Sequence, residues 1–155
     1  MKIKSVSEAL QLFKYILRQV SGEVVSTAAA NFGRHRLVYA RLWYRGVPFN
    51  VKFYLVYQRK PFESFEKFFD FPSKAYTVNK SIIEYCLKMK VHKLIFIDEV
   101  GNVYMVDPLV AYKVAKEKGW IRKTKKTGEV VVHIPTVLMT KIEYKEPDKK
   151  IISYF

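Results

Sequence analysis

The chain has one cysteine, Cys86, among its 155 residues. A single thiol cannot form a disulfide within the chain and cannot supply the paired thiolates of a cysteine-based zinc site. Ile82, Ile83 and Leu87 lie next to Cys86 in the sequence. We therefore expect this thiol to pack as a small hydrophobic group rather than to act as a nucleophile.

Long hydrophobic runs are also missing. The first ten residues lack the apolar stretch of a signal peptide, and no later stretch approaches the roughly 20 apolar residues that cross a bilayer. Half of the residues are nevertheless hydrophobic and 15% are aromatic, which is enough for a folded core. We expect a cytoplasmic protein of one domain, without a membrane span.

Acidic residues are scarce in this chain. Asp and Glu number 14 against 28 Lys and Arg, which gives a net charge of +14. Self-repulsion makes such an excess mildly costly to a fold, so it usually indicates an anionic partner. Nucleic acid is the first candidate, an anionic membrane surface the second and an acidic protein the third.

Apolar periodicity predicts an α+β (mixed α/β) fold, in which an antiparallel or mixed sheet is flanked by about four helices. Helical spacing indicates helices over 6–20, 80–90 and 108–118, and Pro61 is expected to open a short aromatic helix that ends near Phe71. Alternating residues indicate strands within 23–58, a hairpin over 92–106 and a second hairpin over 120–134. The domain is expected to span 1–142, followed by a polar tail, 143–155.

No Asp or Glu occurs between Glu23 and Glu63. This block carries cations beside Tyr39, Trp43 and Tyr44, and guanidinium groups with aromatic rings are what a nucleic-acid surface needs for phosphate contact and stacking. We expect the following cations of the block to contact nucleic acid: Arg34, Arg36, Arg41, Arg45, Arg59 and Lys60. In the alternative interpretation, the rings form core and the cations only surround it.

A second basic cluster lies at the tip of the 120–134 hairpin. It consists of Arg122, Lys123, Lys125 and Lys126. Such a hairpin is able to lie along a groove as an accessory phosphate clamp, but lysine is also a common guard against edge-to-edge strand pairing. Because the 24–62 block is basic as well, we favour the clamp.

Motifs of common enzymes are absent from the sequence. It has no phosphate-binding glycine-rich loop, no Gly-x-Ser-x-Gly and no His-Glu-x-x-His. His35, His92 and His133 are far apart, and we expect them to pack or to contact phosphate rather than to bind a metal. A metal-dependent nuclease requires none of these motifs, because a few carboxylates are enough to hold Mg²⁺ and a lysine assists the attack of water.

Three residues are candidates for such a centre. Glu84 lies between Lys80 and Lys88 at helical spacing, Asp98 ends a predicted strand, and Lys52 is the one charged residue within 49–57. Each has a structural alternative. Glu84 has capping-box spacing from Ser81, Asp98 suits a turn, and Lys52 suits an edge guard. Other carboxylates have expected structural places, Glu8 in a capping box, Asp107 at a helix start and Glu143, Glu146 and Asp148 in the tail.

The order helix, strand, tight turn, strand over residues 81–107 resembles the second half of the restriction-endonuclease-like core, as in archaeal Holliday-junction resolvases. The resemblance implies an acid on the first helix, an Asp on one strand and Glu-x-Lys on the next. Glu8 lies on the first predicted helix, but only Asn50-Val-Lys52 or Gln58-Arg-Lys60 stands in place of Glu-x-Lys, and no Asp lies between 24 and 58. The usual set of catalytic acids is therefore moved or lost.

These features predict a DNA-binding protein, with RNA as the alternative ligand and no membrane partner. The leading hypothesis is Mg²⁺-dependent hydrolysis of phosphodiester bonds, in which Glu84 and Asp98 hold metal or activate water and Lys52 stabilises the phosphate. The alternative is a non-catalytic DNA-binding or architectural protein. The aromatic end of the tail, 151–155, offers a contact for a homodimer.

Overall fold

The computed structural model describes residues 1–29 and 35–146. Arg34, one of the expected phosphate contacts, and the 151–155 segment expected to support a homodimer lie outside the described residues.

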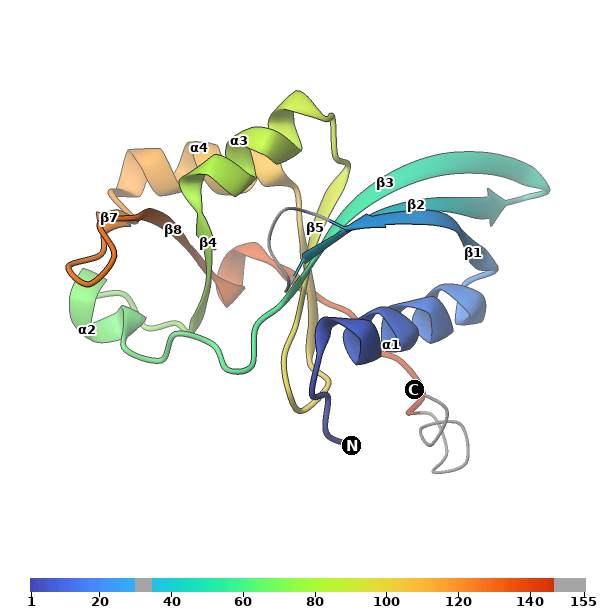
Figure 1. Cartoon of the computed structure of the whole chain (residues 1–155), viewed down its shortest axis with the longest axis horizontal. Coiled ribbons are helices and arrows are strands. Elements are labelled where there is room, and N and C mark those ends of the chain that lie inside the picture. The colour runs from blue at the N-terminus through green and yellow to red at the C-terminus, as the bar shows by residue number, and fades with distance from the viewer. Residues whose placement is uncertain (30–34, 147–155) are drawn as a thin grey trace.

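The described chain is a single mixed α+β unit with four α-helices, as predicted, and it has nine strands (Figure 1). The helices are α1 (Val6–Gln19), α2 (Phe65–Phe69), α3 (Lys80–Lys88) and α4 (Pro108–Lys118). Sheet A has the order β1 (Gly22–Ala29), β2 (His35–Tyr44), β3 (Val47–Tyr57), β5 (Lys93–Ile97), β6 (Val103–Val106) and β9 (Thr140–Lys141). Sheet B has the order β4 (Ala75–Asn79), β8 (Val130–Pro135) and β7 (Ile121–Lys123). All neighbouring strands are antiparallel except β3 and β5.

One face of sheet A is covered by α1. The hydroxyl of Ser5 accepts a hydrogen bond from the Glu8 amide, and the Glu8 carboxylate in turn accepts one from the Lys4 amide, so the helix start is capped by the predicted pair. The buried stripe of α1 then packs on the sheet, where the ring centroids of Phe13 and Phe53 lie 5.0 Å apart. This packing extends along the strands as far as Val24, Leu42 and Val51.

A second core fills the space between the other face of sheet A, sheet B, α3 and α4. Cys86 is fully buried in it, and burial raises the pKa of its thiol to about 12, which confirms its expected packing role. Asp107 caps α4 by accepting the amides of Leu109 and Val110, and Gly119 ends the helix with a φ of 73°. The predicted bounds of α4 are confirmed.

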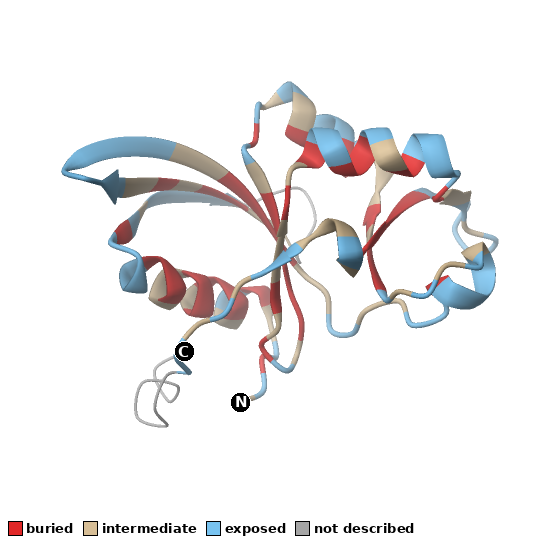
Figure 2. Ribbon diagram, turned by 180° about the vertical axis from the view of Figure 1, so that it is seen from behind, coloured by how far each residue is buried: buried red, intermediate tan, exposed pale blue. Residues whose placement is uncertain are grey.

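The outer part of sheet A projects beyond the rest of the molecule. The first β3–β5 pair is Phe53 with Lys93, so the stretch from Val47 to Lys52 continues past the end of β5 and pairs only with β2. We call this projecting part of the sheet the ribbon; it consists of residues 47–52 of β3, the paired residues 39–44 of β2 and residues 22–26 of β1 (Figure 1). Figure 2 shows the change along these strands, from buried next to β5 to exposed at the tip. Arg45 (φ 50°) and Gly46 (φ 77°) make the two-residue turn at the tip.

Two local predictions are corrected by the structure. The aromatic helix begins at Phe65 and not at Pro61, because Phe62 instead forms a bridge with Ala75. Strands β4 and β9 were not predicted. The sequence allows Ser81 or Asn79 as the N-cap of α3, and the structure has Asn79 there, so Ser81 and Glu84 do not form a capping box. Among the described helices, none combines the length and the apolarity that a bilayer crossing requires.

Candidate nucleic-acid interface

Strand alternation sorts the ribbon side chains onto two faces. Val38 and Phe53 belong to the α1 face. The opposite face, which we call the open face, follows from the register. Its cross-strand rows are Ser26–Tyr39–Lys52, then Glu23–Arg41–Asn50, then Trp43–Pro48 next to the turn. The open face therefore alternates aromatic and cationic side chains along β2, in the order Tyr39, Arg41, Trp43.

Lys52 is fixed where the ribbon leaves the rest of sheet A. Its Nζ donates to the backbone oxygen of Met89, at the C-terminal end of α3, at 2.8 Å, and lies 5.7 Å from the Tyr39 ring centroid. On its β5 side, the Lys52 amide donates to His92 Nδ1 at 3.0 Å and its carbonyl accepts the His92 amide at 2.8 Å. Because both backbone groups are paired there, Lys52 is not an edge guard.

The other two cations of the ribbon are held loosely. Arg41 Nη1 lies 3.5 Å from Glu23 Oε1, and the two side chains are 41% and 57% exposed. An exposed pair of this length contributes little, so a phosphate is able to replace Glu23. The Arg45 guanidinium lies 5.2 Å from the centroid of the Tyr44 ring. Both guanidinium groups are thus available at the surface.

A pocket of about 390 Å³ lies on this face between the ribbon and His92. Its lining includes Tyr39, Arg41, Asn50 and Lys52. None of the residues that line it is acidic. The sequence placed Asn50 and Lys52 on one face of their strand, but it gave no sign that His92 closes that pocket, because His92 approaches only through the β3–β5 pairing.

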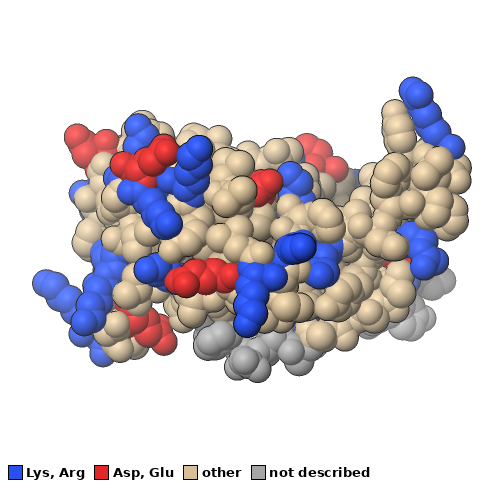
Figure 3. All heavy atoms as spheres, turned by 90° about the horizontal axis from the view of Figure 1, so that it is seen from above, with Lys and Arg blue, Asp and Glu red and all other residues tan. Residues whose placement is uncertain are grey.

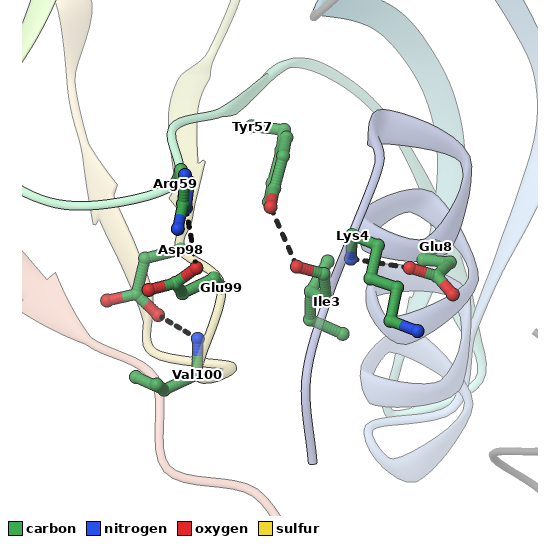
Figure 4. A network of polar contacts seen from close by, with 8 residues as sticks. All are labelled: Ile3, Lys4, Glu8, Tyr57, Arg59, Asp98, Glu99 and Val100. Carbon is green, nitrogen blue, oxygen red and sulfur yellow. Dashed lines mark hydrogen bonds and ion pairs between the residues drawn. The ribbon is translucent and has the colours of Figure 1, made fainter.

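Two further groups of predicted contacts lie elsewhere. Arg36 is paired with Leu55, so it belongs to the α1 face, and its Nη1 donates to the His35 carbonyl at 2.8 Å. Arg59 and Lys60 follow the opposite end of β3. There Arg59 Nε donates to Glu99 Oε2 at 2.9 Å, and this bond lowers the pKa of Glu99 (Figure 4). The acid-free block is therefore continuous in sequence but not one surface.

Asp98 is buried at the end of β5 and its carboxylate holds the β5–β6 turn. It accepts hydrogen bonds from Tyr76 Oη at 3.0 Å, from the Val100 amide at 3.1 Å, and from the amide and Nδ2 of Asn102, both at 2.9 Å. Figure 4 shows the Val100 bond beside the Arg59–Glu99 pair. Burial, and then the charge of Asp98, raise the pKa of Tyr76. Both carboxylate oxygens are thus engaged in the fold.

The three catalytic candidates line three different pockets. Lys52 lies in the open-face pocket, Asp98 in one beside Arg59, and Glu84 in one between α3 and the start of β8, with Lys80 and Glu129. Lys52 and Asp98 stand at opposite ends of β5, roughly 20 Å apart at the rise of a parallel strand. The three residues therefore do not form one catalytic centre in this structure. Within the parts of the chain that the structure describes, no three His, Cys, Asp or Glu side chains gather in a way that suits a metal.

The 120–134 hairpin has a different local structure. Arg122 lies over the rings of Phe62 and Phe68, with centroid distances of 5.6 and 4.9 Å, and its Nε donates to Nε2 of His133 at 3.3 Å. We call the set Phe62, Phe65, Phe68, Trp120, Arg122 and His133 the aromatic box. Phe65 and Trp120 are buried in it, with ring centroids 5.5 Å apart.

His133 is the buried polar centre of the box. Its Nδ1 lies 2.9 Å from Thr77 Oγ1, and its ring stacks on Phe62 at 4.7 Å. Burial, and then the charge of Arg122, lower its pKa to about 4. His133 is therefore neutral near pH 7, and its Nε2 accepts the Arg122 bond.

The remaining lysines of the hairpin, Lys123, Lys125 and Lys126, are exposed. The hairpin and the ribbon tip lie at opposite ends of the long axis of the molecule (Figure 1). Between them, Lys and Arg side chains are spread along the face shown in Figure 3, with acidic groups among them over the helical part. One polyanion that touched both elements would have to run along that axis.

Comparisons of the chain with known protein families, with curated proteins and with solved structures found no match.

Proposed function

We propose that the protein binds nucleic acid through the open face of the ribbon and does not hydrolyse it. DNA is the proposed polymer, with RNA as the alternative. The proposal is carried by one observation, an uncovered sheet face on which Arg41, Asn50 and Lys52 stand among the rings of Tyr39 and Trp43. Guanidinium and ammonium groups suit phosphates, and flat rings suit bases or sugars.

The charge balance of the chain supports the same proposal. A net charge of +14 is spread over the molecule, and the ribbon sequence after Glu23 contributes only cations. Cationic surfaces release counterions from nucleic acid on binding, so affinity falls steeply with salt. The side chain of Lys52 is already held in place by its bond to the Met89 carbonyl, which reduces the side-chain entropy that binding would otherwise cost.

The open-face pocket also favours binding over hydrolysis. In the resemblance to restriction-endonuclease-like proteins, Asn50-Val-Lys52 is one of the two stretches, with Gln58-Arg-Lys60, that stand in place of Glu-x-Lys. Lys52 and Asn50 do lie on one face, but a neutral amide replaces the carboxylate, and the pocket lining is free of acids. Mg²⁺ is usually held by carboxylates, so the pocket is equipped for phosphate and not for metal.

A binding assay with salt and metal arms tests the proposal. Fluorescently labelled DNA, single-stranded and duplex, is titrated with protein at several salt concentrations, with Mg²⁺ or with EDTA. We expect binding in every metal condition, no cleavage, and a weaker complex with a salt slope smaller by about two for Arg41→Gln/Arg45→Gln. Lys113→Gln/Lys118→Gln, two exposed lysines on α4, is the matched control and should bind more nearly like wild type.

Two results would contradict the proposal. Absence of a complex at low salt would refute nucleic-acid binding. Metal-dependent cutting would refute the non-hydrolytic part, and a Glu84→Ala variant would then show whether the carboxylate predicted from the sequence takes part.

A further inference from the structure

The tip of the ribbon exposes aromatic and aliphatic side chains over a short stretch of chain. Trp43 is 47% exposed, Tyr44 62%, Val47 52% and Phe49 50%. Of the large apolar side chains that are exposed in the described chain, no other stretch as short as 43–49 holds so many. Singly scattered apolar residues need no explanation, but a cluster at a projecting tip indicates a contact.

Both faces of the tip are apolar. Trp43 and Pro48 form a cross-strand pair on the open face, and Tyr44 with Val47 forms the next pair on the other face, beside Phe49. Each face therefore offers at least one flat ring to a ligand. Because the tip lies past the ends of α1 and α3, neither helix covers these rings (Figures 1 and 2).

The turn that joins the two strands also carries a cation in an unfavourable backbone conformation. Tight hairpins with positive φ at both turn positions favour Asn-Gly, yet this turn has Arg45 at φ 50° before Gly46. The left-handed conformation brings Cβ close to the following carbonyl oxygen, so an arginine at this position costs the hairpin some stability. A cation at the apex, next to exposed rings, is what a ligand with both phosphates and bases would contact.

We propose that the ribbon tip binds the unpaired bases of single-stranded nucleic acid, with a base stacked on Trp43 and the backbone phosphates held by Arg41 and Arg45. This inference rests on the proposed nucleic-acid binding and specifies the class of ligand. Base faces are open to a ring only where the strand is unpaired, whereas a duplex presents phosphates and base edges. Stacking is indifferent to base identity, so we expect little sequence preference.

Charge argues against a second copy of the chain as the occupant, and the polar groups beside the tip argue against a lipid surface. The sequence has no Asp or Glu from residue 24 to 62, so two ribbon tips would bring like charges together on chains of +14 each. The open face next to the tip carries Asn50, Lys52 and His92 around a pocket, and such hydrogen-bonding groups suit a strand that passes from the tip toward α3 better than they suit a membrane.

The two tryptophans provide the probe. Trp43 is exposed whereas Trp120 is 5% exposed, so quenching of tryptophan emission by an added oligonucleotide reports on Trp43. Wild-type protein is titrated with oligo-dT, oligo-U, a blunt duplex hairpin, and an oligonucleotide of the same length whose sites are abasic. The abasic chain keeps the phosphates and removes the rings.

We expect oligo-dT and oligo-U to quench the emission and to bind about 10-fold or more tightly than the abasic chain. Trp43→Ala should lower the affinity for oligo-dT by a similar factor and should change the affinity for the abasic chain little. Trp43→Phe should retain most of the affinity for oligo-dT. Leu109→Ala, an equally exposed apolar residue on α4, is the matched control and should change neither value. Trp43 is on the surface, so the variants should fold, and their unfolding curves check this.

Several results would overturn the inference and leave the proposed function intact. Equal affinity for oligo-dT and the abasic chain would overturn it. So would tighter binding of the duplex without quenching. Unchanged oligo-dT binding by Trp43→Ala would overturn it as well. Tip-dependent binding of anionic vesicles in place of oligonucleotides, or self-association that Trp43→Ala abolishes, would assign the tip to another partner. No binding of any oligonucleotide at low salt would instead refute the proposed function.

Discussion

The ribbon and the aromatic box contain the same kinds of residue and use them in opposite ways. In the box, Trp120 is buried and Arg122 lies over the rings of Phe62 and Phe68 while it donates to a neutral His133. In the ribbon, Trp43 is exposed and Arg41 has only a long, solvent-exposed partner. Rings and guanidinium groups thus stabilise one end of the molecule, and at the other end they remain available to a ligand.

The difference lies in what covers each set. The box is closed by α2 and by the pairing of β8 with β4 and β7, whereas the ribbon extends past β5 and its tip extends past α1. Burial of an aromatic ring contributes several kcal/mol to a fold, and an exposed ring contributes little. Residue type alone therefore does not indicate function. The neighbouring helices and strands decide whether the rings and cations are buried or available to a ligand.

The largest expected contrast is in stability. Phe65 is fully buried against Phe69, Phe71 and Trp120, so Phe65→Ala should lower the free energy of unfolding by about 3–5 kcal/mol. Phe49→Ala, at the ribbon tip, should cost well under about 1 kcal/mol. Urea unfolding of the two variants measures both values. Similar losses of unfolding free energy in both variants would show that the ribbon rings also stabilise the fold, and would contradict the contrast between ribbon and box.

The pH dependence of stability should follow His133. Its pKa is about 4 in the folded protein against an ordinary 6.5, so the unfolded state takes up the proton first as pH falls. The contribution of neutral His133 to the free energy of unfolding is fully present above about pH 6.5, and about 3 kcal/mol of it should be lost by pH 4. His133→Gln should remove this loss, whereas His92→Gln, at an exposed site, should keep it. A wild-type stability that is flat from pH 6.5 to 4.5 would contradict the buried, neutral state of His133.

The two basic elements should differ in their effect on affinity. Arg41→Gln/Arg45→Gln removes ribbon cations, and Lys125→Gln/Lys126→Gln removes two lysines at the tip of the β7–β8 hairpin. We expect the ribbon pair to weaken single-strand binding and to abolish part of the tryptophan quenching. The hairpin pair, as an accessory clamp, should reduce the salt slope while leaving quenching at saturation unchanged. Equal affinity and slope after the hairpin change would make that hairpin a plain solvated turn.

The smallest predicted effect is at the apex of the ribbon. Arg45→Asn places a residue that tolerates positive φ in the turn, so it should stabilise the protein by up to about 1 kcal/mol. The same change should weaken oligonucleotide binding, because it removes a phosphate contact. Thermal unfolding of this variant tests the expected gain in stability, and a binding titration tests the expected loss of affinity. A variant that is more stable and binds equally well would show that Arg45 has no role in recognition.

Much of the fold was predictable because its signals are local. Asp107 and Gly119 mark the two ends of α4, and alternation in 49–58 correctly separated the two faces of β3. β4 was missed because its five residues become a strand through pairing with β8, more than fifty positions later in the chain. Local pattern carries no information about such a partner.

The candidate site was predictable in part. The acid-free block drew attention to Arg41, Arg45 and Lys52, which the structure places in the ribbon. It also included Arg36, which lies on the other face, and Arg59, which pairs with Glu99. The proposed catalytic roles of Glu84, Asp98 and Lys52 stay predictions from the sequence, and the fold does not bring these residues together. These placements depend on strand register and strand length, and both are set by pairing between strands that are distant in the sequence.

Photocrosslinking to a single strand tests the central claim most directly. The protein is irradiated with oligo-dT, digested with trypsin, and the crosslinked peptides are identified by mass spectrometry. The ribbon predicts crosslinks in peptides 42–45 and 46–52, which carry Trp43, Tyr44 and Phe49. Crosslinks confined to the aromatic box or to the β7–β8 hairpin, with none in the ribbon, would contradict the account.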